Sequence, residues 1–221
     1  MDVKKILSAC DHTLLDRGAT KEDIERIIDE GKKYSVASVC IPPCHVKHAK
    51  EYSKGDVKIC TVIGFPNGYS STAVKVFEAA LAKDNGADEI DMVINHGMVR
   101  AGDFSGILDE INAVKDAVDG KILKVIIETC LLTEDEKIAL CEVVSNSRAD
   151  FIKTSTGFSH GGATPEDVKL LSENMKNGKG VKAAGGISNL TDAELFLSLG
   201  ATRLGTSRIV KLVKNEFADG Y

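Results

Sequence analysis

Residues 149–185 read ADFIKTSTGFSHGGATPEDVKLLSENMKNGKGVKAAG and contain the repeating unit of the predicted fold. Two short runs rich in apolar and β-branched residues, at 149–153 and 181–185, flank the stretch 164–176, whose apolar spacing is that of an amphipathic helix. Strand, helix and strand in this order predict two neighbouring parallel strands joined by a crossover helix. We therefore expect a parallel sheet covered by helices.

The same alternation repeats along all 221 residues. Runs that we interpret as strands lie at 6–10, 36–41, 57–63, 88–94, 122–128, 149–153, 181–185 and 202–206. Helical patterns lie between them, at 20–34, 71–84, 104–118, 133–146, 164–176 and 191–199. Eight units at a spacing of roughly 25 residues are typical of a small (β/α)₈ barrel, because a doubly wound sheet usually has fewer strands. We predict one α/β domain, a (β/α)₈ TIM barrel over residues 1–221, with a loose tail from about residue 216.

Four of the predicted helices begin with a threonine that an acidic residue follows three positions later. The pairs are Thr20 with Asp23, Thr133 with Glu136, Thr164 with Asp167, and Thr191 with Glu194. A threonine hydroxyl at this place accepts a hydrogen bond from a free backbone N–H, and the acidic side chain can return one. We expect the helices to begin at these residues.

Composition excludes several classes of partner. The 33 acidic and 28 basic residues give a net charge of −5 and form no basic stripe, so we expect no nucleic acid and no membrane as partner. The apolar stretch near the first residue is too short to span a bilayer and is interrupted by Asp11 and His12. The six cysteines of a chain this long are expected to be reduced thiols in a cytoplasmic protein.

Two lysines end neighbouring predicted strands, Lys153 in ADFIK and Lys182 in VKAAG. The catalytic groups of such barrels lie at the carboxyl ends of the strands, so the two side chains can meet there. A second ammonium roughly 4 Å away lowers a lysine pKa by some three units, which favours the neutral amine that attacks a carbonyl. The alternative is that each lysine pairs with a carboxylate or a bound phosphate, and the pattern leaves open which lysine would attack.

Three carboxylates belong to the same predicted mouth. In DEIDMVI, residues 88–94, Ile90, Met92 and Ile94 form an outward apolar face, so Asp91 points into the barrel with Glu89. Asp91 can transfer protons opposite the lysines or form a structural ion pair with one of them. Asp11 and Glu128 allow the same two interpretations, of which the structural one is favoured.

Glycine-rich turns follow the last three predicted strands and predict an anion site. Backbone N–H groups at such turns bind phosphate, and barrels commonly build this site after strands seven and eight. The turns contain Thr156, Gly157, Gly185, Gly186, Gly205 and Ser207. The same glycines can also serve only to permit tight turns. Neighbouring cysteines and histidines at 40–48 match no standard zinc spacing, so we expect no metal.

Several blocks of sequence make the chain resemble the deoxyribose-phosphate aldolases over nearly its full length. The blocks are DHTLL (11–15), TVIGFPNG (61–68), GADEIDMVIN (86–95), KVIIET (124–129), ADFIKTSTGF (149–158), VKAAGGI (181–187) and RLGTS (203–207). The resemblance implies a class I aldolase, a lyase without metal or cofactor. It implies reversible cleavage of 2-deoxy-D-ribose 5-phosphate to D-glyceraldehyde 3-phosphate and acetaldehyde through a lysine Schiff base, in deoxyribonucleoside catabolism.

The resemblance also implies roles for individual residues. Lys153 would form the Schiff base, Lys182 would lower its pKa and relay protons, and Asp91 would donate and accept protons. The substrate and its phosphate would contact Asp11, Thr156, Gly157, Gly185, Gly186, Gly205 and Ser207. Where some members of the family carry lysine this chain has Phe158, and where some carry a small residue it has Arg208, which we expect to bind the phosphate instead.

Members of this family often end in tyrosine on a mobile tail, so Tyr221 is expected to reach the mouth and assist protonation, unless the tail is merely disordered. Separately, an apolar strip on one or two helices is expected to form the interface of a homodimer or homotetramer, and the pattern leaves open which helices form it. The alternatives are another lysine-dependent sugar-phosphate aldolase, transaldolase-like, or a non-catalytic phosphate-binding barrel, which the lysine pair argues against because binding needs no second buried cation.

Overall fold

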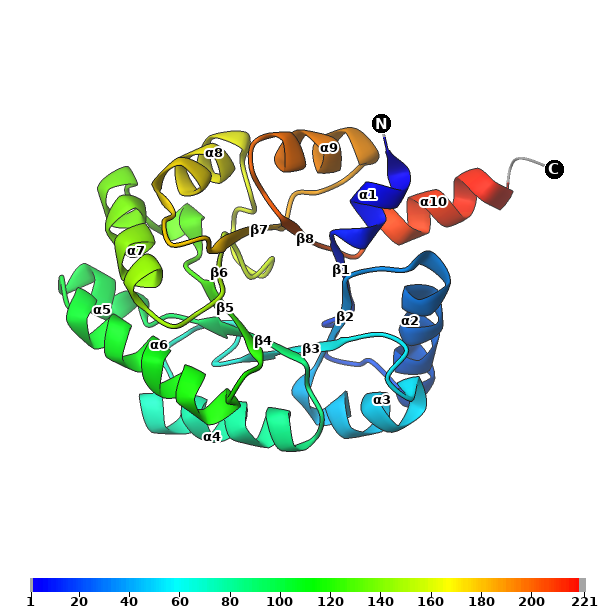
Figure 1. The fold of residues 1–221 in the computed structure, drawn as a ribbon, viewed down its shortest axis with the longest axis horizontal. Helices are drawn as coiled ribbons and strands as arrows, with labels where there is room; N and C mark the ends of the chain where they lie inside the picture. Colours follow the sequence, from blue (N-terminus) through cyan, green and yellow to red (C-terminus); the bar gives the residue numbers. More distant parts are fainter. Residues whose placement is uncertain (1, 219–221) are drawn as a thin grey trace.

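In the computed structural model, which describes residues 2–218, eight parallel strands close into a barrel in chain order, with β1 paired to both β2 and β8 (Figure 1). This confirms the predicted (β/α)₈ fold. The strands are β1 (Cys10–Thr13), β2 (Ser38–Ile41), β3 (Ile59–Ile63), β4 (Glu89–Val93), β5 (Ile122–Ile126), β6 (Phe151–Lys153), β7 (Gly180–Ala184) and β8 (Arg203–Thr206).

Helices surround the ring of strands, and their inner faces complete the core (Figure 1). They are α1 (Val3–Ser8), α2 (Lys21–Tyr34), α3 (Val46–Ser53), α4 (Thr72–Asp84), α5 (His96–Arg100), α6 (Phe104–Val118), α7 (Glu134–Asn146), α8 (Pro165–Asn174), α9 (Leu190–Ser198) and α10 (Ile209–Ala218), with 3₁₀ turns η1 (Pro43–His45) and η2 (Thr129–Leu131). The core between barrel and helices is aliphatic, in keeping with the absence of tryptophan from the chain.

The alternation along β4 separates two environments. Ile90 and Met92 belong to the apolar core between barrel and helices, together with Ile94 just after the strand. Glu89 and Asp91 are fully buried on the other face, inside the barrel. Because successive side chains of a strand point to opposite faces, this strand delivers two carboxylates to the barrel interior, as the sequence predicted.

The first predicted strand, at 6–10, is wrong in its placement. Residues Val3–Ser8 form helix α1, and the strand begins only at Cys10. The Asp2 side chain caps α1 by accepting a hydrogen bond from the backbone N–H of Lys5, and Ile6 and Leu7 are buried against the rest of the fold. Two buried neighbours are compatible with one turn of helix as well as with a strand, so the short apolar run did not distinguish them.

Three of the four predicted threonine caps are present. Thr20 and Thr133 form complete capping boxes with Asp23 and Glu136, and Thr164 accepts a hydrogen bond from the N–H of Asp167. The fourth is wrong, because α9 begins at Leu190 and not after Thr191. Its cap is Asn189, whose side chain accepts a hydrogen bond 2.8 Å long from the N–H of Asp192.

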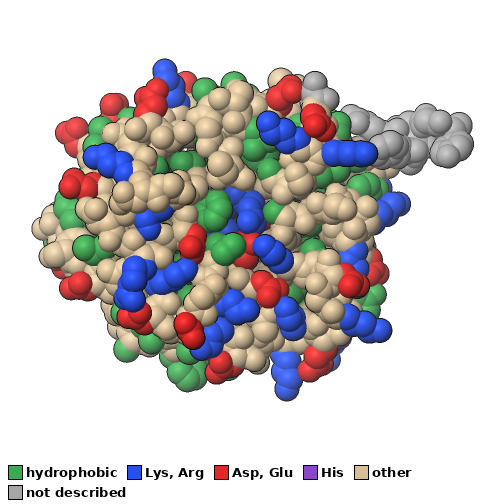
Figure 2. Space-filling model, viewed as in Figure 1, with side chains coloured by type: hydrophobic (Ala, Val, Ile, Leu, Met, Phe, Trp, Pro, Cys, Tyr) green, Lys and Arg blue, Asp and Glu red, His purple; other side chains and the backbone are tan. Residues whose placement is uncertain are grey.

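At the carboxyl end, α10 extends to Ala218, so the helix continues past residue 216, where we expected a tail to begin. Among residues 2–218, no helix is both long and apolar enough to cross a membrane. Acidic and basic side chains are interspersed over the face of the molecule shown in Figure 2.

Candidate active site

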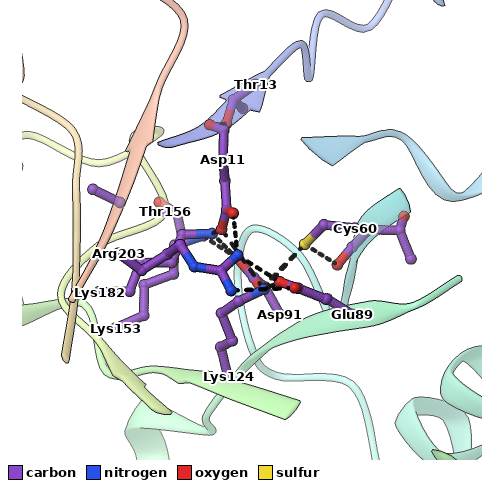
Figure 3. A network of polar contacts seen from close by, with 12 residues as sticks. Asp11, Thr13, Cys60, Glu89, Asp91, Lys124, Lys153, Thr156, Lys182 and Arg203 are labelled. Carbon is purple, nitrogen blue, oxygen red and sulfur yellow. Dashed lines mark hydrogen bonds and ion pairs between the residues drawn. The ribbon is translucent and has the colours of Figure 1, made fainter. Parts of the chain in front are cut away.

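Lys153 ends β6, and Lys182 lies beside it in the middle of β7. They are register partners, and both ammonium groups donate to the same oxygen of Asp91, with Nζ to Oδ2 distances of 2.7 Å each (Figure 3). The structure therefore brings the predicted pair together with the predicted carboxylate between them. The ion-pair interpretation of Asp91 is present, and it does not exclude proton transfer between the two nitrogen atoms that this carboxylate joins.

A third lysine, Lys124 on β5, completes the surroundings of Asp91. Its Nζ lies 2.8 Å from Asp91 Oδ1 and 2.7 Å from Glu89 Oε2, and its side chain is fully buried. Lys124 is not among the site residues predicted from the sequence. The signal was available, because Lys124 interrupts an apolar strand at an inward position and is the β5 register partner of Asp91.

Beneath the lysines, Asp11 on β1 belongs to a buried network and not to the wall of a cavity. One oxygen of Asp11 accepts hydrogen bonds from Arg203 Nη1 at 2.6 Å and Ser38 Oγ at 2.7 Å, and the other pairs with Lys182. Arg203 also bonds Glu89, at 2.9 Å. Asp11 is fully buried, which favours the structural interpretation over the expected contact with substrate.

This packing of opposite charges fixes the protonation of the interior. Burial alone would raise the pKa of the Asp91 carboxyl, but Lys124, Lys153 and Lys182 hold it well below its usual value. Burial alone would lower the pKa of the Lys182 ammonium, but Asp11 and Asp91 outweigh that effect and raise it. Asp91 is therefore a carboxylate, and Lys182 is an ammonium in this arrangement.

Above the network lies a cavity of about 830 Å³, and Lys153 is part of its wall. Lys182 and Asp91 are at most 1% exposed and lie behind it. The predicted mouth residues that line this cavity are Thr156, Gly157, Gly185, Gly186, Gly205, Ser207 and Arg208. The cavity is also lined by Arg17 and Lys211, two cations that the sequence analysis did not select. The structure thus distinguishes Lys153 as the barrel lysine that a ligand can reach.

Backbone geometry explains two of the glycine positions. Gly185 and Gly186 have φ values of +74° and +75°, in the left-handed region that favours glycine, and they form the cavity wall before α9. At Gly205 a Cβ would come within 3.1 Å of Lys182 Cε. That glycine therefore makes room for the extended Lys182 side chain in addition to lining the cavity.

Phe158 stands at the boundary between this cavity and a smaller one of about 290 Å³, whose walls include Pro43, Val62 and Phe65. Its ring meets that of Phe65 edge to face, with 5.2 Å between centroids. Phe158, which stands where some members of the family carry lysine, thus forms an apolar part of the wall.

Glu128 is buried between β5 and the 3₁₀ turn η2, and it contacts Thr156, one of the residues of the cavity wall. The predicted structural ion pair is not found: among residues 2–218 its hydrogen bonds come from Thr156. Tyr221 lies outside the described residues, so its expected role stays a prediction.

Two buried groups place possible metal ligands within 4.8 Å of one another, Cys40, Cys60 and Asp91, and Asp11, Cys60 and Glu89. The carboxylates of both groups already bind ammonium or guanidinium groups, which would repel a cation. Burial also raises the pKa of the Cys60 thiol well above its usual value, so this side chain is a poor ligand. The donor set therefore fits a metal ion badly.

Comparison with known proteins agrees with this geometry. The sequence profile of the DeoC/LacD family aldolases matches residues 5–202. The chain is 59% identical over 216 residues to a deoxyribose-phosphate aldolase of Streptococcus pyogenes, which covers 98% of this chain and 97% of that protein.

Two solved structures extend the agreement to three dimensions. One from Coccidioides immitis has a TM-score of 0.94 at 41% identity and covers 98% of this chain and 87% of its own. The other is a tetrameric deoxyribose phosphate aldolase from Aeropyrum pernix, with a TM-score of 0.89 at 30% identity over 98% of this chain and 93% of that one. These matches agree with a barrel lysine that borders a cavity lined by cations. They show that the chain belongs to the DeoC/LacD family of aldolases and is a lyase.

Proposed function

We propose that this enzyme reversibly cleaves 2-deoxy-D-ribose 5-phosphate to D-glyceraldehyde 3-phosphate and acetaldehyde, with Lys153 as the Schiff-base residue, as a step in deoxyribonucleoside catabolism. The observation that carries the assignment is that Lys153 lines the cavity while its Nζ contacts Asp91. The relative with 59% identity carries the name of this activity.

Charge balance explains how Lys153 becomes a nucleophile. Within residues 2–218, the network described above contains four cations, Lys124, Lys153, Lys182 and Arg203, and three carboxylates, Asp11, Glu89 and Asp91. Loss of one proton makes the cluster neutral. Lys153 is the cation that borders the cavity, so its proton can leave to water, and the remaining ammonium groups keep Asp91 ionised.

The neutral amine of Lys153 attacks the aldehyde carbon of the open-chain sugar, and loss of water gives an iminium ion. The iminium nitrogen then accepts the electron pair of the C2–C3 bond, so that bond breaks and glyceraldehyde 3-phosphate leaves. Protonation of the enamine at C2 and hydrolysis release acetaldehyde and regenerate the amine. Asp91 and Lys182 carry the protons that the nitrogen and the departing water need during these steps.

The phosphate lies in the rim formed by Gly157, Gly185, Gly186, Gly205 and Ser207. The rim lies before the first turn of α10, the end of a helix that favours an anion, and Arg208, Arg17 and Lys211 add positive charge. Arg208 is held by a hydrogen bond of 3.2 Å from Nη1 to Ser188 Oγ, which directs its guanidinium along the rim. Thr156 contacts the sugar from the opposite wall.

The decisive experiment is reduction with borohydride in the presence of acetaldehyde, followed by peptide mass measurement. A stable adduct on Lys153 supports the mechanism, and an unmodified Lys153 overturns it. Comparing cleavage of deoxyribose 5-phosphate with cleavage of fructose phosphates separates this activity from other sugar-phosphate aldolases. Deletion of Tyr221 without any change in turnover would remove that residue from the proposal.

The proposal includes assembly of this chain into a homodimer or homotetramer through α4. That helix presents Val74, Phe77 and Leu81 to solvent, with exposed fractions of 48%, 68% and 49%. The A. pernix structure is described as tetrameric. Sedimentation equilibrium of Phe77→Glu beside the matched surface variant Leu195→Glu tests this, because only the first should shift the mass toward the monomer.

We also propose that the protein is cytoplasmic. The six cysteines of the protein are free thiols, among them Cys40 and Cys60 close to the lysines. Free thiols persist in reducing compartments such as the cytoplasm. Fractionation of cells that express the protein tests the assignment.

A further inference from the structure

Glu128 occupies a strained place in the fold. Its φ is +51°, a left-handed conformation that residues with a side chain adopt at an energetic cost, and the side chain is only 3% exposed. Such conformations persist where the surrounding structure requires them, often at functional sites. Among residues 2–218, no lysine, arginine or histidine forms an ion pair with this carboxylate, although the neighbouring network contains several cations.

Within residues 2–218, the hydrogen-bond donors to the Glu128 carboxylate all belong to Thr156. The Thr156 backbone N–H lies 3.2 Å from Oε1, and the Thr156 hydroxyl donates a short hydrogen bond to Oε2. The same hydroxyl oxygen accepts a hydrogen bond of 3.0 Å from the N–H of Phe158. Because a hydroxyl has one proton and two lone pairs, one lone pair of Thr156 remains for a third partner.

Thr156 borders two cavities. It lines the large cavity beside Lys153, and it also lines a cavity of about 140 Å³ on the side of Glu128 and His96. A substrate hydroxyl in the large cavity can therefore donate to Thr156 Oγ1, whose own proton is already directed at a carboxylate. Figure 3 shows Thr156 beside the lysines.

Breaking the C2–C3 bond requires a base for the C3 hydroxyl, and Asp91 is poorly suited to that task. Its Oδ2 accepts from Lys153 and Lys182, and its Oδ1 accepts from Lys124 and lies 3.4 Å from Cys60 Sγ. These cations lower the pKa of the carboxyl, so Asp91 is a weak base. Glu128, by contrast, forms no ion pair with a cation among residues 2–218, and it is hydrogen-bonded to Thr156, which lines the cavity.

We propose that Glu128, a positioning residue acting through Thr156, takes up the proton of the C3 hydroxyl as the C2–C3 bond breaks. The inference rests on the function proposed above. The C3 hydroxyl proton passes to Thr156 Oγ1 while the Thr156 proton passes to Glu128. The O–H electron pair becomes the carbonyl bond of glyceraldehyde 3-phosphate, and the C2–C3 pair moves to the enamine. In the synthetic direction, the same two protons return.

Two half-reactions distinguish this role from a structural one. Exchange of acetaldehyde methyl hydrogens for deuterium needs the Schiff base and the enamine but no C3 hydroxyl, whereas cleavage of deoxyribose 5-phosphate needs all three. In Glu128→Gln the amide oxygen can still accept from the Thr156 N–H, but the side chain cannot hold the proton. We expect kcat for cleavage to fall about 10²-fold with KM changed less than about threefold, and exchange to stay within about twofold.

Variants of Thr156 test independently whether the proton passes through its hydroxyl. Thr156→Val removes the hydroxyl and should reduce cleavage as Glu128→Gln does, whereas Thr156→Ser restores the hydroxyl and should recover most of kcat. Glu134→Gln, an exposed glutamate in the first turn of α7, is the matched control and should alter neither reaction. A loss of folded protein lowers the rates of cleavage and exchange by the same factor, so their ratio is unchanged. The ratio therefore tests the role of Glu128 even in a variant that is partly unfolded.

The outcomes separate this inference from the function on which it rests. Equal loss of exchange and cleavage in Glu128→Gln, or no loss of either, overturns the role of Glu128. Loss of cleavage in Thr156→Val that Thr156→Ser does not relieve overturns the relay. If wild-type protein forms no reducible adduct with acetaldehyde, the Schiff-base function itself fails, whatever the Glu128 variants do.

Discussion

The barrel interior and the rim of its mouth both carry several cations, but the two regions hold them in opposite ways. Inside, Lys124 and Lys182 are at most 1% exposed and each contacts two or more carboxylates. At the rim, Arg17, Arg208 and Lys211 are exposed around the cavity. The two buried lysines are already paired with carboxylates, whereas the rim cations can still bind an anionic ligand.

This difference separates chemistry from binding. Ion pairs in the interior fix the protonation and direction of each group before a substrate arrives, which is the property expected of preorganised catalytic groups. Rim cations attract a phosphate and hold it at one end of the cavity, where solvent screens them and geometry is less demanding. Lys153 belongs to both regions, because it contacts Asp91 and lines the cavity.

Replacement of Lys153 should give the largest effect on activity. Lys153→Leu removes the nucleophile, so we expect kcat/KM for deoxyribose 5-phosphate to fall by about four orders of magnitude. The fold should persist, because Lys124 and Lys182 still neutralise Asp91 and water from the cavity can occupy the vacated space. Steady-state kinetics with circular dichroism test both parts, and Lys169→Leu, an exposed lysine on α8 outside the cavity wall, is the matched control that should retain activity.

Replacement of Lys124 should instead break the interior. In Lys124→Met, oxygen atoms of Asp91 and Glu89 lose a donor in a place that water does not reach, so we expect the free energy of unfolding to fall by about 3 to 5 kcal/mol. Urea denaturation measures this. Lys169→Met, at an exposed pair with Glu173, is the control and should leave the midpoint unchanged. A midpoint shift of equal size in both variants would contradict the contrast between buried and exposed cations.

The contrast also explains which features the sequence could predict. Alternating apolar runs and helical patterns predicted the barrel, since periodicity and strand number follow directly from the order of residues. They also predicted that Lys153, Lys182 and Asp91 would meet, because strand ends converge on one mouth. The N-terminal helix and the Asn189 cap were missed, since each depends on one local choice between two hydrogen-bonding patterns.

The missed and misplaced site residues have a common physical reason. Asp11 was expected near the substrate because it follows an apolar run, but depth along the barrel axis is set by strand register, which single runs do not reveal. Lys124 and Arg203 meet Asp91 and Glu89 only once eight strands close around them. In the sequence, each of these two residues is a charged residue at an inward position of a strand. That pattern predicts a buried side chain, but it does not predict which residue pairs with it.

Acid should destabilise the interior more than the rim. The surrounding cations, working against burial, lower the pKa of the Asp11 carboxyl. A lowered carboxyl pKa stabilises the fold above the unfolded-state value of about 3.9, and this stabilisation is lost as pH falls through the folded-state value. The wild-type free energy of unfolding should therefore drop steeply below about pH 4.

One variant in the barrel interior and one at the exposed cavity wall isolate the pH dependence of the free energy of unfolding. Asp11→Asn removes one interior titration, so its loss of stability between pH 5 and acid should be smaller than in wild type by about 2 kcal/mol, although the variant is less stable at neutral pH. Asp16→Asn, at the exposed part of the cavity wall, should keep the wild-type slope. Urea unfolding over a series of pH values measures the slopes, and identical slopes in all three proteins would contradict the prediction.

The smallest effect is expected at the rim, where each cation shares the phosphate with others. Arg208→Ala should raise KM for deoxyribose 5-phosphate about tenfold and change kcat less than about twofold, because Arg17, Lys211 and the backbone N–H groups still bind the anion. Arg26→Ala, which lies on α2 away from this cavity, is the matched control. The ratio of KM between variant and wild type should shrink as salt increases, since screening weakens an exposed cation but not a buried pair. An unchanged KM in Arg208→Ala would mean that the glycine-rich turns hold the phosphate without this side chain, and that the rim charges serve only to attract the substrate.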